Sequence, residues 1–237
     1  MSGYSLGIKE LDELLGSIRE GTNLMMIGPP MSQKDDLLAA IIFNSQDLNS
    51  QDSEDSAIIV STREPGERVL GWFEDNGVDV LNSDIGVVDC VTKTLGLGAA
   101  DTDKIKRASS PVDLTGIGVK ISQFFEEMLV RKQKKKIHLC INSLSTILMY
   151  SNIQTVFRFL HVFTGRVKAA NGFGLYVVED EMHDAQTIAT LKQLFDGMVE
   201  IKAVGDAYAM RVVGMTSKPT PWFEYSIDGT EISLKRT

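Results

Sequence analysis

The sequence predicts an α/β fold with a mostly parallel central sheet, flanked by helices and extended by antiparallel strands near its C-terminal end. Short apolar runs rich in Ile, Val, Leu and Met alternate with amphipathic helical patterns. The runs show little polar alternation, which is typical of strands buried on both faces of a parallel sheet. The repeated order of strand and helix indicates right-handed crossovers in a doubly wound sheet.

Five segments have the composition of buried strands, and four segments between them have helical periodicity. The strands are expected at 23–28, 57–62, 85–90, 137–142 and 173–179, and the helices at 33–45, 65–75, 115–133 and 152–170. Two polar segments without periodicity, 44–56 and 98–111, are expected to be flexible loops.

The C-terminal part changes character. Residues 197–215 predict two strands joined at Gly205-Asp206, and residues 221–236 predict a second pair that turns at Asp228-Gly229. An antiparallel extension of the parallel sheet follows. The sequence contains no internal repeat, so we expect residues 1–237 to form a single domain.

Composition limits the classes of partner. The 237 residues are 43% hydrophobic and 24% charged, with a formal net charge of −8. An acidic chain makes nucleic acid an unlikely partner, and the basic run 131–136 is expected to end a helix. No apolar run is long enough to span a bilayer. Cys90 and Cys140 each end an apolar run, which predicts buried, reduced thiols in a cytoplasmic protein.

The stretch MMIGPPMSQKDDLLAAIIFN, residues 25–44, has the outline of a phosphate-binding loop between a strand and a helix. In a loop of the form G-x-x-x-x-G-K-[ST], backbone N–H groups and the lysine bind phosphates, and the hydroxyl residue binds Mg²⁺. Gly28 and Lys34 have the right separation here, but Gln33 replaces the second glycine and Asp35 replaces the hydroxyl. The candidate nucleotide-binding residues are Gly28, Pro29, Pro30, Met31, Ser32, Gln33, Lys34, Asp35 and Asp36.

Each replacement has a physical consequence. The Gln33 side chain crowds the phosphate side of the loop. The Asp35 carboxylate would repel phosphates in the absence of a metal, although it could bind Mg²⁺ itself because hard oxygen ligands suit that ion.

The same residues also fit a structural interpretation. Ser32-x-x-Asp35 matches a capping box, with Ser32 as the N-cap of the helix. Lys34 would then pair with Asp35 or Asp36, or lie in solvent. Weak nucleotide binding and a helix that satisfies its own N-terminus therefore both remain open.

The whole chain resembles the KaiC-like branch of the RecA/RadA superfamily of P-loop ATPases. LGIKELDELLGSIREGTNLMMIGPP is similar to the opening of that branch, in which GxxxLDxLLGGxIPxGxxxLxxGPPGTGKT recurs. VSTREPGERVLGWFEDNGVDV resembles its second strand and following helix, and the segment 139–202 resembles its Walker B strand, next crossover and sheet extension. The resemblance implies a RecA-like fold and an ATP site between subunits.

Further departures fall on the same chemistry. The Walker B aspartate of that family corresponds to Asn142, which offers a carbonyl oxygen without charge. Two adjacent glutamates that polarise the attacking water correspond to Arg63 and Glu64. Glu64 could act as a general base, or it could simply precede the helix. In a swap hypothesis, Asp35 and Asn142 together hold the metal.

These observations predict a KaiC-like homologue with degenerate Walker A and Walker B motifs and lost or feeble hydrolysis. Its role would be that of a regulatory or scaffolding module, with ATP and Mg²⁺ bound weakly or not at all. Its partners would be proteins, either further copies of itself or active KaiC-like relatives. The alternative is an active but unusual Mg-ATP-binding ATPase that uses Lys34, Asp35 and Glu64.

Overall fold

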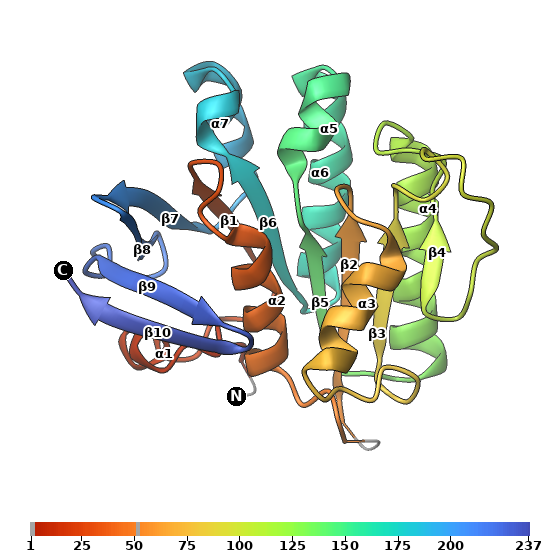
Figure 1. Cartoon of the computed structure of the whole chain (residues 1–237), viewed down its shortest axis with the longest axis horizontal. Helices are drawn as coiled ribbons and strands as arrows, with labels where there is room; N and C mark the ends of the chain where they lie inside the picture. The colour runs from red at the N-terminus through yellow and green to blue at the C-terminus, as the bar shows by residue number, and fades with distance from the viewer. Residues whose placement is uncertain (1–2, 51–52) are drawn as a thin grey trace.

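The computed structural model describes residues 3–50 and 53–237. Their strands form a ten-stranded sheet in the order β10-β9-β8-β7-β1-β6-β5-β2-β3-β4 (Figure 1). The strands are β1 (Thr22–Gly28), β2 (Asp55–Ser61), β3 (Ile85–Asp89), β4 (Ile105–Arg107), β5 (Lys136–Ile141), β6 (Phe173–Glu179), β7 (Gly197–Val204), β8 (Ala207–Val213), β9 (Phe223–Asp228) and β10 (Glu231–Arg236).

The helices include the four that the periodicity predicted, within one or two residues at most boundaries. They are α1 (Lys9–Leu15), α2 (Lys34–Ser45), α3 (Gly66–Asp75), α4 (Leu114–Phe125) with its π-helical continuation η1 (Glu126–Arg131), α5 (Leu144–Tyr150), α6 (Ile153–Ala169), the 3-10 turn η2 (Asp180–Met182) and α7 (Ala185–Lys192). The predicted α/β fold with a mostly parallel sheet is confirmed.

The parallel strands separate two hydrophobic cores. Along β1, Leu24 and Met26 belong to the core that packs α1, α2 and α3, whereas Met25 and Ile27 belong to the core that packs α4, α6 and α7. Figure 1 shows α2 and α3 in front of the sheet. Strands buried on both faces explain why their sequences lack polar alternation.

The antiparallel extension is also confirmed. β7 pairs with β8 across Gly205-Asp206, and Gly205 has the positive φ of 59° that such a turn requires. In the second hairpin, Asp228 is still in β9, so the two-residue loop is Gly229-Thr230, one residue later than predicted.

The segment 98–111 was predicted to be a flexible loop, and this was wrong for three of its residues. Ile105–Arg107 form β4, which pairs with β3 at the edge of the sheet. The Arg107 side chain is buried beside the carboxylate of Asp89, with Nε 3.6 Å from Oδ2. In the other polar segment, 44–56, residues 51–52 lie outside the described residues, and β2 begins at Asp55.

Asp89 ends β3 and is fully buried. Its Oδ2 accepts hydrogen bonds from the Gly66 N–H at 3.0 Å and the Thr92 hydroxyl at 2.5 Å, and its Oδ1 accepts from the N–H groups of Val91 and Thr92. Burial raises the pKa of this carboxyl, but the hydrogen bonds from Thr92, Gly66 and Val91 outweigh it and hold the pKa below 3.8. Asp89 therefore joins the start of α3 to the loop after β3.

His138 is buried in β5 between two aromatic rings. Its ring centroid lies 5.0 Å from that of Tyr4 and 5.5 Å from that of Phe173, both in edge-on geometry. Burial, with a smaller contribution from Lys136, lowers the pKa of His138 from 6.5 to about 3. The ring is therefore neutral in the folded protein at physiological pH.

We expect this histidine to make the protein less stable as the pH falls. The unfolded chain binds a proton at His138 below pH 6.5, whereas the folded chain does not until about pH 3. Between pH 7 and pH 5, wild-type protein should lose about 2 kcal/mol more free energy of unfolding than His138→Phe, since one unit of pH difference is worth ~1.4 kcal/mol. Urea unfolding at both pH values measures this, and the substitution His161→Gln, at an exposed histidine, is measured beside it as the control variant. If wild type and His138→Phe lose the same free energy of unfolding between pH 7 and pH 5, the ring of His138 is not buried in its neutral form.

The structure also bears on the expectations for the cysteines, the basic run and membrane-spanning helices. Cys90 and Cys140 are buried and unpaired, as predicted. The basic run follows η1, where Lys132 and Lys134 both form ion pairs with Asp84. Within the described residues, no helix has the length and apolar character needed to cross a membrane.

Candidate functional site

The loop that follows β1 keeps an unusual backbone conformation. Met31 and Gln33 both adopt the left-handed conformation, with φ values of 64° and 54°. Neither is glycine, so the loop stores backbone strain of about 1–3 kcal/mol at each position. The Met31 side chain is 89% exposed at the tip. The position where the ATPase pattern has its second glycine thus has a left-handed backbone here, although it holds a glutamine.

The predicted capping box is wrong. α2 begins at Lys34, and its N-cap is Gln33, which makes no side-chain capping hydrogen bond. The Ser32 hydroxyl instead donates to the carbonyl oxygen of Pro29 at 2.8 Å, and the Ser32 carbonyl accepts a hydrogen bond from the Tyr225 hydroxyl. Because Gln33 is left-handed, Ser32 turns back into the loop.

The sequence suggested that Lys34 pairs with the acids beside it or lies in solvent. The structure shows neither arrangement. The Lys34 side chain is 2% exposed, and Nζ lies 2.5 Å from Oε2 of Glu179, whose side chain is 7% exposed. The same ammonium donates to the Pro29 carbonyl and to the Ser32 hydroxyl at 2.9 Å. The ammonium therefore has one ion-pair partner and two hydrogen-bond acceptors within the protein.

The partner carboxylate comes from the end of the neighbouring strand. β6 pairs with β1 in parallel, and the register places Glu179 opposite Gly28. Arg63, which follows β2, extends the cluster: its Nη1 lies 3.3 Å from Oε1 of Glu179 and 3.1 Å from Oδ2 of Asp35. Two cations and two carboxylates thus occupy the carboxyl edge of the sheet.

Asp35 lies among groups that shift its pKa in opposite directions. Burial raises the pKa of Asp35, Arg63 lowers it, and the neighbouring carboxylates of Glu179, Asp36 and Glu64 raise it further. Half of the Asp35 side chain nevertheless remains exposed.

Asn142 and Glu64 lie close to the loop but have structural partners. Asn142 Oδ1 accepts hydrogen bonds from the Thr62 N–H at 2.9 Å and the Thr62 hydroxyl at 3.1 Å. Glu64 precedes the N-cap of α3 at Pro65, and its carboxylate is 3.7 Å from Nε of Arg68 one turn later. Asp35, Asp36, Glu64 and Asn142 line the same cavity of about 130 Å³.

These side chains fit a bound Mg²⁺–nucleotide poorly. The lysine ammonium that would meet the phosphates is buried against Glu179, and Asn142 Oδ1 accepts a hydrogen bond from the Thr62 N–H and lies 3.1 Å from the Thr62 hydroxyl. Among the described residues, no cluster of three or more His, Cys, Asp or Glu side chains could hold a metal ion. The cavity is also smaller than the roughly 300–1,000 Å³ of typical ligand pockets.

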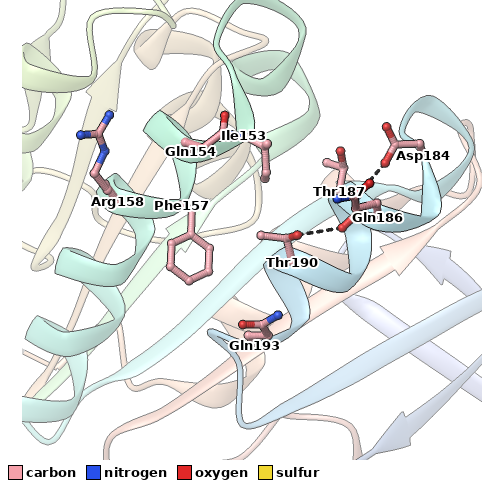
Figure 2. A pocket seen from close by; sticks show the side chains of 9 residues that line it. All are labelled: Ile153, Gln154, Phe157, Arg158, Asp184, Gln186, Thr187, Thr190 and Gln193. Carbon is pink, nitrogen blue, oxygen red and sulfur yellow. Dashed lines mark hydrogen bonds between the residues drawn. The ribbon is translucent and has the colours of Figure 1, made fainter.

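A larger hollow lies between α6 and α7. Its volume is about 500 Å³, and Figure 2 shows the side chain of Phe157 on α6 pointing toward those of Thr190 and Gln193. Asp184 caps the start of α7 by accepting a hydrogen bond from the Thr187 N–H at 2.6 Å. The groove is lined mainly by amide, hydroxyl and charged side chains.

Sequence reasoning found the loop but missed the residues that complete it. Glu179 ends an apolar strand and Arg63 replaces a glutamate of the resembled family, but the sequence alone assigned neither side chain to the loop. A basic residue at position 63 and an acid at the end of a buried strand could together have predicted an ion pair beside the loop. That prediction requires the strand order, because β6 lies beside β1 although almost 150 residues separate them.

Two solved structures share the fold over the full length of the chain. An uncharacterized protein PH0321 from Pyrococcus horikoshii, solved in complex with an unknown peptide, has 17% identity and a TM-score of 0.71, with 98% of this chain and 99% of that chain covered. The KaiC-like protein PH0186 from Pyrococcus horikoshii OT3 has 14% identity and a TM-score of 0.68, with 99% of each chain covered. The fold is therefore KaiC-like.

No functionally curated protein matches the sequence. A model of a family of unknown function, DUF7504, matches residues 21–201, which is most of the chain. The chain therefore belongs to the DUF7504 family.

Proposed function

We propose that this chain is a KaiC-like-fold protein that has lost nucleotide hydrolysis and acts as a regulatory or scaffolding module through protein contacts. The observation that carries the proposal is the buried pair of Lys34 and Glu179. Phosphoryl transfer depends on a lysine and a metal that neutralise phosphate charge. Here a carboxylate of the same chain neutralises the lysine.

Protein contact as the mode of action has two supports. The structurally similar protein PH0321 was solved with an unknown peptide. In this chain the groove between α6 and α7 (Figure 2) is open and has the size of a ligand site, and its amide and hydroxyl side chains suit a peptide backbone. Further copies of the chain and active KaiC-like relatives are the partners that we propose first.

The second candidate, an active Mg-ATP-binding ATPase, has one observation in its favour. Asp35, Glu64 and Asn142 line the same cavity beside the loop. Metal binding there requires Asn142 to give up its hydrogen bonds with Thr62. If Asp35 had taken over as the charged metal ligand, Asp35→Ala would abolish Mg²⁺-dependent nucleotide binding.

Calorimetric titration with ATP, with and without Mg²⁺, tests the proposal. We expect no heat of binding up to millimolar ATP for wild-type protein, because release of Lys34 would break its pair with Glu179. Heat that disappears in Lys34→Ala, but persists in the exposed control Lys192→Ala, would contradict the proposal and favour the ATPase.

A further inference from the structure

The carboxyl edge of the sheet has a second place where a ligand site is expected. In open α/β sheets, ligands bind where neighbouring strands send the chain to opposite faces. β1 and β6 form one such point, since α2 packs in one core and α7 in the other. β2 and β5 form another, because α3 follows β2 on one face and α5 and α6 follow β5 on the other.

The two places at the edge of the sheet differ in what occupies them. The first is filled by the pair of Lys34 and Glu179. The second is hollow, with a cavity of about 370 Å³ that lies outside the ends of β2, β3 and β5. This volume is within the range of small-molecule sites. It is distinct from the smaller cavity beside Asp35.

The walls of this cavity are largely apolar. Cys90, Val91, Pro111, Val112 and Tyr150 contribute to them. At the rim, Tyr150 is 68% exposed and Val112 is 44% exposed. Large apolar side chains that remain open to water around a concavity favour an apolar ligand, because each would bury surface on binding.

The threonine hydroxyls of the wall have no hydrogen left to donate to a ligand. The Thr62 hydroxyl contacts Asn142 and the Ser143 carbonyl, and the Thr94 hydroxyl contacts the Cys90 carbonyl at 3.2 Å. The Thr146 hydroxyl lies 3.1 Å from the hydroxyl of Ser143. Their hydrogens are engaged within the protein.

Arg63 supplies the charged group in the wall. Both of its ion pairs, with Asp35 and Glu179, run through Nη1. A guanidinium carries five N–H donors, so those on Nε and Nη2 remain for an acceptor in the cavity. Its side chain is 44% exposed, which keeps it accessible. Guanidinium geometry matches a carboxylate bidentately.

We propose that this pocket binds a small amphipathic carboxylic acid, whose apolar body packs against Val91, Val112 and Tyr150 and whose carboxylate accepts hydrogen bonds from Arg63. The site meets the charge cluster of the phosphate loop only at Arg63, and it does not rest on the proposed function. If the pocket does not bind acids, the proposed loss of nucleotide binding at Lys34 is unaffected. If the loop does bind ATP, the proposed acid site is likewise unaffected.

The test is a titration of the full chain with 3-phenylpropionate, followed in ¹H–¹⁵N spectra, beside 3-phenylpropanamide, which has the same body without the charge. We expect the acid to bind at least about tenfold more tightly than the amide, because only the acid forms charge-assisted hydrogen bonds with the Arg63 guanidinium. The shifted signals should be those of Cys90, Val91 and Thr146.

Two variants locate the site. Arg63→Met should bring the acid and the amide to within about twofold of each other, whereas Val112→Trp, which fills the pocket from an exposed loop, should weaken both by about tenfold or more. Circular dichroism checks that each variant is folded. Equal affinities for acid and amide in wild-type protein, no binding at 10 mM, or shifts confined to the groove between α6 and α7 would overturn the proposal.

Discussion

Replacing Glu179 by glutamine is expected to lower the free energy of unfolding by about 3–5 kcal/mol, which is the usual effect of removing one partner from a buried ion pair. The substitution leaves the buried Lys34 ammonium without a counter-charge, because the Pro29 carbonyl, the Ser32 hydroxyl and the amide oxygen of the new side chain are all neutral acceptors. Urea unfolding monitored by circular dichroism measures the loss. A change of this size from one atom replacement would show that the pair is closed to water.

A double-mutant cycle separates the pair from its surroundings. Lys34→Met should also be destabilising, but the double variant Lys34→Met/Glu179→Gln should lose less than the sum of the single changes, because neither charge is then left unpaired. Arg63→Gln is the matched control: the Arg63 side chain is itself 44% exposed, so its loss should cost under about 1 kcal/mol. Additive single changes would mean that Lys34 and Glu179 do not interact.

Asp89→Ala is expected to cost a similar amount, about 3–5 kcal/mol, for a different reason. The change removes an acceptor of hydrogen bonds from Gly66, Val91 and Thr92, and leaves the buried guanidinium of Arg107 with Glu67 and the Ala100 carbonyl. The measurement is urea unfolding at pH 7. The exposed Asp75→Asn serves as a control that should unfold like the wild type.

The effect of Asp89 should also depend on pH in a defined direction. The pKa of the folded protein lies below the ordinary value of 3.8, so the stabilisation is present above pH 3.8 and is lost as the pH falls through the lower folded value. The difference between wild type and Asp89→Ala should therefore shrink below pH 3.8. A difference that stays constant to lower pH would mean that the charge of Asp89 contributes nothing.

Much of the fold could be predicted because buried parallel strands have a simple sequence signature. The segments 137–142 and 173–179 correspond to β5 and β6 to within a residue, since an unbroken apolar run has few other structures available. α1 and α5 have seven residues each, too few for a 3.6-residue period to be distinguished from chance. β4 has three residues in a polar segment, and it depends on tertiary contacts of Arg107 rather than on local sequence.

The candidate site was predictable only in part. Gly28 and Lys34 are near in sequence, so their spacing identified the loop. The partner of Lys34 is set by strand order and register, which place Glu179 opposite Gly28. Ser32 was assigned to a cap because its spacing to Asp35 fits one, but the left-handed backbone of Gln33 directs it into the loop. Backbone strain at a glutamine cannot be read from the sequence.

The most direct test of the central claim is the ¹⁵N signal of the Lys34 ammonium, assigned by its absence in Lys34→Met. A buried ammonium that is paired with Glu179 and hydrogen-bonded to Pro29 and Ser32 should give a slowly exchanging signal that millimolar Mg-ATP leaves unchanged. That result would mean that Glu179 permanently holds the lysine of the loop. A signal that shifts on addition of ATP, and more strongly in Glu179→Gln, would contradict the account, because the loop would then still bind phosphates.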